Sequence, residues 1–257
     1  MTSLTDTIVF ITGASSGIGR SCACAFARAG AKLVLAARRK NRLEKLSGEL
    51  KKQFHTETWI GELDVRDKRA VARFFRKLPD EWRNIEILVN NAGLSRGLNK
   101  LYEGKIEDWE EMIDTNVKGL LYVSRTVLPG MVERKKGTVI NIGSIAGHDV
   151  YTGGNVYCAT KHAVDALTKG MRMDLVDTPI RVCTVDPGLV ETEFSEVRFH
   201  GDKERAKKTY QNMTPLTPDD IADAVLFAAT RPAHVQIAEL IIMPTAQAST
   251  SLVHRAS

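Results

Sequence analysis

The chain has 257 residues, of which 43% are hydrophobic and 26% charged, a composition typical of an ordinary globular protein. Its 36 basic and 31 acidic residues give a net charge of +5, but the basic residues form separate short clusters and only 6% of residues are aromatic. Nucleic-acid binding requires a continuous basic face with interleaved aromatic residues, so we expect no nucleic-acid partner. No apolar run approaches the roughly 20 residues that cross a bilayer, so we expect no membrane insertion.

The cysteines and the first residues indicate the compartment. The four cysteines show neither a C-x-x-C pair nor the spacing of metal ligands, and the six histidines are scattered. The N-terminus lacks the basic stretch and apolar core of a signal peptide. We therefore expect free thiols, no metal site and a cytoplasmic protein.

Along the chain, apolar and β-branched runs alternate with longer helical patterns. The apolar runs predict strands at 7–12, 32–37, 57–62, 85–90, 137–143, 179–185 and 237–243. The helical patterns predict helices at 17–29, 40–54, 67–77, 107–133, 155–176 and 218–229. Strands separated by helices indicate a parallel sheet covered on both faces. The predicted fold class is α/β, a doubly wound sheet of about seven strands in a single domain over residues 1–257.

The first predicted strand is followed by the glycine motif Thr12-Gly13-Ala14-Ser15-Ser16-Gly17-Ile18-Gly19. Strand, glycine turn and helix form the context in which such a motif binds a dinucleotide. Gly13 would make the tight turn, Gly17 would let the backbone approach a pyrophosphate at the helix N-terminus, and Gly19 would let the helix pack closely on the sheet. The alternative is a glycine-rich turn without a ligand. The residues of this loop that we predict to bind the cofactor are Gly13, Ser15, Ser16, Gly17, Ile18 and Gly19.

The second predicted strand ends in Arg38 and Arg39, where an NAD-binding protein normally carries an acidic residue for the ribose 2′-hydroxyl. Two guanidiniums would pair with a 2′-phosphate instead, at roughly 1.5–3 kcal/mol for each charge-assisted hydrogen bond. The predicted cofactor is therefore NADP (NADPH). The alternative is a solvated basic start of the next helix, because Lys40 and Arg42 continue the run.

Other candidate residues also fall where strands end. The first six predicted strands are followed by Gly13, Arg38, Asp64, Asn91, Ser144 and Pro187, respectively. Open α/β sheets bind ligands at the carboxyl ends of their strands. Asp64, with Val65 beside it, is a candidate acceptor for an adenine amino group, and its alternative role is to cap the helix that begins near Asp67.

Tyr157 and Lys161 lie four residues apart on the predicted helix 155–176, so their side chains project from the same face. A phenol titrates near pH 10, and an adjacent positive charge favours the phenolate. Such a pair can exchange a proton with an alcohol or a carbonyl. The spacing alone is weak evidence, and it gains weight from the dinucleotide motif at the start of the chain.

Two later segments have no place in the sheet. The segment 190–217 is long for a connection between a strand and a helix, and we interpret it as a lid over the substrate. The polar tail 244–257 begins at Pro244 and is either loose or docked on a neighbour.

Taken together, these motifs resemble those of the short-chain dehydrogenase/reductase family over essentially the whole chain. The resemblance rests on Thr12 to Gly19, Asn90-Asn91-Ala92-Gly93, Asn116 within Asp114-Thr115-Asn116, Ser144, Tyr157-x-x-x-Lys161 and Pro187-Gly188. It implies a Rossmann fold and a catalytic tetrad of Asn116, Ser144, Tyr157 and Lys161. The further cofactor contacts that it implies are Asn91, Ala92, Gly93, Tyr157, Lys161, Pro187, Gly188, Val190 and Thr192.

The resemblance also implies a role for each member of the tetrad. Tyr157 would be the general acid/base, and Ser144 would hydrogen-bond the substrate oxygen. Lys161 would lower the pKa of Tyr157 and hold the nicotinamide ribose, and Asn116 would anchor a water that relays the proton. The plainer alternatives are a strand-end cap for Ser144, an Asx turn for Asn116 and a solvated helix charge for Lys161.

The second half of the chain resembles, more narrowly, the NADP-dependent 3-hydroxy acid dehydrogenases, through Ile142 to Gly147, Pro187 to Ser195 and Met243-Pro244 with Gln247. Those enzymes oxidise serine, allo-threonine and related 3-hydroxy acids, or reduce malonic semialdehyde. The substrate carboxylate needs a cation, for which Arg198 in the lid is the candidate, with a plain surface arginine as the alternative. The predicted substrate-binding residues are thus Ser144, Tyr157 and Arg198.

Rival functions are a broad carbonyl or ketosteroid reductase and a non-catalytic NADP(H)-sensing protein. Family resemblance further implies a homotetramer in which the helices at 107–133 and 155–176 pair across subunits.

Overall fold

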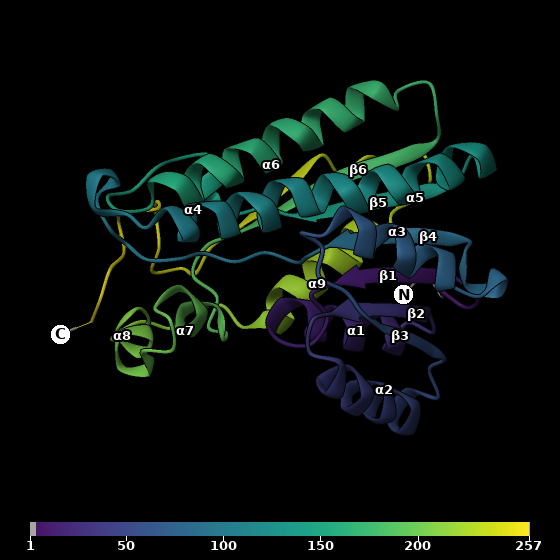
Figure 1. Ribbon diagram of the computed structural model, residues 1–257, viewed down its shortest axis with the longest axis horizontal. Coiled ribbons are helices and arrows are strands. Elements are labelled where there is room, and N and C mark those ends of the chain that lie inside the picture. The colour runs from purple at the N-terminus through teal and green to yellow at the C-terminus, as the bar shows by residue number, and fades with distance from the viewer. Residues whose placement is uncertain (1–3, 257) are drawn as a thin grey trace.

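The computed structural model describes residues 4–256, whose strands form a parallel sheet with helices on both faces (Figure 1). The strands are β1 Ile8–Thr12, β2 Lys32–Ala37, β3 Thr58–Glu62, β4 Ile85–Asn90, β5 Gly137–Ile142, β6 Ile180–Pro187 and β7 Glu239–Ile242. Their order in the sheet is β3-β2-β1-β4-β5-β6-β7, and every neighbouring pair is parallel. The predicted α/β class with a seven-stranded, doubly wound sheet is confirmed.

The helices form two layers. They are α1 Gly17–Arg28, α2 Lys40–Phe54, α3 Lys68–Lys77, α4 Ile106–Ile113, α5 Leu120–Arg134, α6 Asn155–Asp174, α7 Phe194–Arg198, α8 Lys203–Lys208 and α9 Pro218–Ala229. One layer contains α1, α2 and α9, and the other contains α3, α5 and α6. The short helices α7 and α8 lie apart from both layers, in the connection between β6 and α9 (Figure 1). Along residues 4–256, no helix is long and apolar enough to cross a lipid bilayer.

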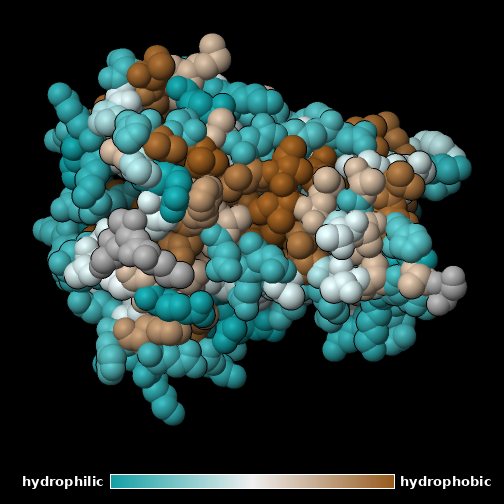
Figure 2. All heavy atoms as spheres, turned by 180° about the vertical axis from the view of Figure 1, so that it is seen from behind, coloured by the Kyte–Doolittle hydropathy of each residue, from teal (hydrophilic) through white to brown (hydrophobic). Residues whose placement is uncertain are grey.

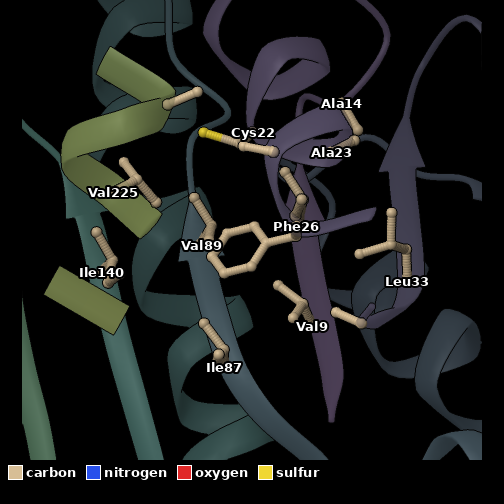
Figure 3. Packing of buried hydrophobic residues seen from close by; sticks show 14 of the residues in the cluster. Val9, Ala14, Cys22, Ala23, Phe26, Leu33, Ile87, Val89, Ile140 and Val225 are labelled. Atoms are coloured by element: carbon tan, nitrogen blue, oxygen red, sulfur yellow. The ribbon is translucent and has the colours of Figure 1, made fainter. Parts of the chain in front are cut away.

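The apolar strands supply both cores because neighbouring side chains point to opposite faces of the sheet. In β1, Val9 packs in the core under α1 and α9, whereas Phe10 packs under α3 and α5. On the first face, Phe26 of α1 points toward Val89 of β4, as Figure 3 shows. All residues of β1 are therefore buried, as its uninterrupted apolar sequence predicts.

The N-cap of α3 is not Asp64, the alternative role considered for this residue, but Asp67. Asp67 caps α3 by accepting a hydrogen bond from the backbone N–H of Arg69 at 2.7 Å. The carboxylate of Asp64 instead accepts hydrogen bonds from the guanidinium of Arg66, from Nε at 3.0 Å and from Nη2 at 2.6 Å. The alternative role of Asp64 as the N-cap of α3 is therefore wrong, because Asp67 occupies the N-cap position of this helix.

The helix predicted at 107–133 is not α-helical throughout. It consists of α4, a π-helical turn at Asp114–Gly119, and α5. A Cβ atom at Gly119 would lie 2.6 Å from Cγ2 of Val65, so this turn packs against the end of β3 more closely than another residue would allow. The turn contains Asn116, and π turns within α-helices recur at functional sites.

Candidate active site

A cavity of about 400 Å³ lies at the carboxyl edge of the sheet, around the point where the strand order reverses between β1 and β4. Such switch points are where open α/β sheets bind ligands. Nearly all predicted site residues line it, namely Gly13, Ser15, Ser16, Gly17, Ile18, Arg38, Arg39, Asp64, Val65, Asn91, Ala92, Gly93, Ser144, Tyr157, Lys161, Pro187, Gly188, Val190, Thr192 and Arg198. Gly19 and Asn116 do not line it, and both are buried.

The glycine turn between β1 and α1 has the shape that the motif predicts. Gly13 has a φ of +65°, which favours glycine. A Cβ atom at Gly19 would lie 2.5 Å from the carbonyl oxygen of Gly13, so Gly19 serves close packing rather than ligand contact. The amide of Asn91 donates to the carbonyl of Thr12 at 2.9 Å and fixes the turn from the end of β4.

The start of α1 is suited to an anion. The N-cap residue Ser16 has a hydroxyl that accepts a hydrogen bond from Arg39 Nη2 at 2.6 Å, and the first turn carries no carboxylate. First-turn N–H groups and the helix dipole attract a phosphate. The loop, the helix start and the adjacent arginine thus fit a dinucleotide with a phosphate on its adenosine ribose.

The two predicted phosphate arginines differ in their surroundings. Arg39 donates to Ser15 Oγ at 3.2 Å and to a carboxylate oxygen of Glu193 at 2.8 Å, and Arg42 donates to the other oxygen of Glu193 at 2.6 Å. Arg38 is half exposed and lies 3.6 Å from Glu111. Arg39 is therefore better placed than Arg38 to bind a 2′-phosphate. Arg42, predicted only as part of a solvated basic run, shares Glu193 with Arg39.

Ser144 and Tyr157 lie together on the other side of the cavity. The side chain of Tyr157 is only 8% exposed, and its ring packs edge-on against Phe194 with centroids 5.7 Å apart. Ser144 Oγ accepts from the N–H of Ala146 at 3.1 Å and donates to the carbonyl of Pro187 at 3.4 Å, so the plainer expectation of a cap is met, while the residue also lines the cavity. A single hydroxyl can do both, because its oxygen has two lone pairs and one donor.

The pKa of Tyr157 departs from the expectation. Burial raises it well above its ordinary value, and Tyr151 adds to this, while Arg198 and a hydrogen bond with Ser144 act in the opposite direction. The net direction is thus opposite to the predicted lowering, and Lys161 is not among the main causes of the shift. The Lys161 Nζ lies 5.9 Å from the centroid of the Tyr157 ring and donates to the carbonyl of Ile142 at 2.9 Å.

Lys161 is not the solvated helix charge of the alternative reading. Its side chain is 6% exposed, and burial lowers its pKa to about 8, although Asp186 favours the charged form. Asn116 lies nearby: a Cβ atom at Gly93 would be 3.3 Å from Asn116 Oδ1 and 3.7 Å from Lys161 Nζ. Asn116 also pairs with the backbone of Leu94, accepting from its N–H at 2.9 Å and donating to its carbonyl at 2.8 Å.

Arg198 is not a surface arginine. It lines the cavity from α7, where its guanidinium lies 5.2 Å from the centroid of the Tyr157 ring. It donates from Nε to Ser95 Oγ and from Nη2 to Tyr151 Oη, both at 3.0 Å. Among residues 4–256, its Nη1 group has no hydrogen-bond partner in the protein. The arrangement brings a hydroxyl, a phenol and a cation into one cavity.

Comparison with known proteins agrees with this geometry. The sequence profile of the family described as "short chain dehydrogenase" matches residues 7–203. The chain belongs to this family. Among its relatives is the NADP-dependent 3-hydroxy acid dehydrogenase YdfG of Escherichia coli (strain K12), 49% identical over 250 residues that cover 96% of this chain and 99% of that protein. An NADP-dependent 3-hydroxy acid dehydrogenase of Schizosaccharomyces pombe is 45% identical over 99% of both chains.

Solved structures of short-chain dehydrogenases are also similar. The closed form of serine dehydrogenase complexed with NADP+ matches with a TM-score of 0.91 and 49% identity, covering 97% of this chain and 100% of that one. Serine dehydrogenase from Escherichia coli matches with a TM-score of 0.81 and 43% identity over 94% of this chain.

Several residues of this short-chain dehydrogenase site carried no sequence signal. Ser95 and Tyr151 hold Arg198, and Glu193 holds Arg39, yet each pair is far apart in sequence. Outside the cavity, His148 Nε2 lies 3.3 Å from the buried Asp186 and 3.2 Å from Glu239. Only the tertiary fold joins these residues, so spacing could not reveal them.

Proposed function

We propose that the protein is an NADP-dependent oxidoreductase that interconverts a small 3-hydroxy acid and its 3-oxo acid or semialdehyde. Serine, allo-threonine and 3-hydroxypropionate are the substrate types we expect. The names and the high identity of the relatives support the cofactor and the substrate class. The residues of the cavity support the same proposal independently.

The observation that carries the substrate class is the position of Arg198. A hydroxy acid differs from a simple alcohol or ketone by its carboxylate, and a buried carboxylate needs a cation. The guanidinium of Arg198 lies in the same cavity as Ser144 and directly over the ring of Tyr157. A substrate carboxylate bound to Arg198 would leave its 3-hydroxyl free to reach Ser144 and Tyr157.

The cofactor would lie along the carboxyl edge of the sheet. Residues of the glycine turn and the start of α1 would hold the pyrophosphate, and Arg39, with Arg38 beside it, would bind the 2′-phosphate. Asp64 and Val65 would border the adenine, and Asn91 to Gly93 would support the ribose. Backbone groups of Pro187 to Val190 would orient the nicotinamide, which supplies the hydride chemistry when bound.

Tyr157 would move the proton and Ser144 would hydrogen-bond the reacting oxygen. In reduction, the neutral phenol donates its proton to the carbonyl oxygen, and burial favours this form. In oxidation, the phenolate takes the hydroxyl proton, and the positive charge of Arg198 favours that form. Ser144 would donate to the oxygen where negative charge develops. Asn116 would anchor a water that exchanges the proton with solvent past Lys161.

The test is a substrate panel measured with purified protein. We expect reduction of NADP+ with L-serine and with 3-hydroxypropionate, and much slower reduction of NAD+. A preference for hydrophobic ketones with NADPH would favour the carbonyl reductase alternative. Cofactor binding without turnover of any substrate would favour the sensing protein.

We further propose a cytoplasmic homotetramer in which the segment 190–217 is the lid. The tail from Pro244 onward lies on its own chain, where Thr250 Oγ1 donates to Asp149 at 2.7 Å and the N–H of Ala256 donates to the carbonyl of Asn212 at 2.8 Å. The face in Figure 2 carries a group of hydrophobic residues at its centre. Ile113 of α4 and Leu121 of α5 expose about two fifths of their surface, and both lie in the segment 107–133 that is expected to pair across subunits with 155–176. Uncovered apolar surface of this kind marks interaction sites. Light scattering coupled to size-exclusion chromatography measures the assembly directly.

A further inference from the structure

Glu193 joins two arginines at the adenosine end of the cavity. Its Oε2 accepts from Arg39 Nη1 at 2.8 Å, and its Oε1 accepts from Arg42 Nη1 at 2.6 Å. Burial alone would raise the pKa of this carboxyl, but the two guanidiniums hold it below its ordinary value, so Glu193 is ionised near neutrality. Each guanidinium is thus bound to its own oxygen of one anion.

The position of Glu193 makes these contacts relevant to the cofactor. Arg39 also donates to Ser15 and Ser16 of the glycine turn, and both serines and Glu193 line the cavity. The preceding residue, Thr192, lies over the turn, because a Cβ atom at Gly17 would be 3.3 Å from its Cγ2. The carboxylate therefore lies beside the turn, on the guanidiniums that would face a 2′-phosphate.

We propose that Glu193 is an internal anion that competes with the 2′-phosphate of NADP for Arg39 and Arg42. This inference rests on the proposed NADP-dependent function. A phosphate presents several oxygens in the same way as the carboxylate does, and both anions cannot occupy one pair of guanidiniums without repulsion. The three side chains are each roughly two fifths exposed, and ion pairs at such exposure are weak enough to exchange.

Glu193 also belongs to the connection between β6 and α9. Glu193 is the N-cap residue of α7, which carries Arg198 at its other end. The ion pairs of Glu193 with Arg39 and Arg42 attach the N-terminal end of α7 to the start of α2. Exchange of Glu193 for phosphate would release that attachment, so binding of the adenosine end would be coupled to movement of the substrate cation.

The experiment compares two ligands that differ only in the 2′-phosphate, adenosine 2′,5′-bisphosphate and 5′-AMP, by isothermal titration calorimetry. In Glu193→Gln, the affinity for the bisphosphate should increase about three- to tenfold, because a competing and repelling charge is removed. The affinity for 5′-AMP should not change. In an Arg39→Ala background, the gain from Glu193→Gln should shrink.

The matched control is Glu191→Gln, which removes the same charge two residues earlier on an exposed side chain without an ion pair among residues 4–256. It should leave the ratio of the two affinities unchanged. An unchanged bisphosphate affinity in Glu193→Gln would overturn the proposal. A lower affinity would overturn it as well, by showing that Glu193 positions the arginines for the phosphate. Equal affinities of the wild type for the two ligands would overturn the NADP assignment as well, so the two failures are distinguishable.

Discussion

The guanidinium of Arg198 stacks on the ring of Tyr157, at 5.2 Å from its centroid, although the two residues come from different elements and α7 lies apart from the helical layers. A cation over a phenol ring favours the phenolate, and Arg198 indeed lowers the pKa of Tyr157 against the larger effect of burial. The same guanidinium has N–H groups free to bind an anion. We therefore propose that Arg198 connects recognition of the substrate to the proton transfer.

Replacement of Arg198 by alanine should raise the KM for L-serine and 3-hydroxypropionate about ten- to hundredfold, because a charge-assisted hydrogen bond contributes roughly 1.5–3 kcal/mol. Neutral carbonyl substrates should be affected much less. Steady-state kinetics with both substrate classes measures the ratio. Tyr151→Phe is the control, since it removes a hydrogen-bond partner of Arg198 and keeps the charge. A ratio that stays the same in Arg198→Ala would exclude this role.

Tyr157→Phe should lower turnover by about 10²–10⁴-fold, the usual contribution of general acid/base catalysis. The ring keeps its packing against Phe194, so the fold and the affinity for NADPH should change little. Fluorescence titration with NADPH and single-turnover kinetics separate binding from chemistry. Loss of both in equal measure would argue against proton transfer by this phenol.

The two arginines after β2 should differ in their effect on cofactor choice. Arg39→Ala should weaken NADP binding roughly ten- to hundredfold and leave NAD binding almost unchanged, because only the 2′-phosphate loses a partner. Arg38→Ala should have a smaller effect, since Arg38 is half exposed and faces Glu111. Dissociation constants for both cofactors test this. A larger effect of Arg38 would reverse our assignment.

The sequence predicts the sheet and most of the site because its signals are local. The inner strands β1, β2, β4, β5 and β6 are mostly buried apolar runs, and Gly13, Asn91 and Ser144 follow such runs closely. The contacts of Arg198 with Ser95 and of Glu193 with Arg39 were not predictable, because they join segments about a hundred residues or more apart. Neither the periodicity of a sequence nor its motifs predict which loops come into contact at the carboxyl edge of the sheet.

The π turn at Asp114–Gly119 and the pKa of Tyr157 show a second limit. The apolar pattern of 107–133 predicts a helix, but it does not show that the hydrogen bonds change from i+4 to i+5 over a single turn. The Tyr-x-x-x-Lys spacing predicts proximity of two charges, but not how much solvent surrounds them. Here desolvation outweighs the attraction, which only the packing of Tyr157 reveals.

The rate of oxidation should rise with pH, by about tenfold per pH unit while the phenol is mostly neutral, because this direction requires the phenolate of Tyr157. Burial raises the pKa of Tyr157, so the neutral form dominates near neutrality and the reduction rate should stay nearly constant there. The rates of oxidation and of reduction, measured as a function of pH in one buffer series, test this difference. An oxidation rate independent of pH would contradict the raised pKa.

Lys161→Met should stabilise the protein while abolishing turnover. Burial lowers the pKa of Lys161 from 10.5 to about 8, which corresponds to ~3 kcal/mol of unfavourable free energy for the charged form in the fold. Loss of the hydrogen bond to Ile142 offsets about 1–2 kcal/mol of this gain. The free energy of unfolding at pH 7 should therefore increase by about 1–2 kcal/mol, as measured by urea denaturation.

The pH dependence identifies the cause of this gain. The unfolded lysine binds its proton more tightly than the folded one, so the wild type becomes more stable as pH rises from about 8 toward 10.5. The advantage of Lys161→Met should be complete below about pH 8 and fade above it. Lys169→Met, on the exposed face of the same helix, should change stability by no more than about 0.5 kcal/mol. A destabilised Lys161→Met at pH 7 would mean that contacts of Lys161 outweigh its desolvation, whereas a stabilised, inactive variant would show that the buried ammonium is kept for the reaction rather than for the fold.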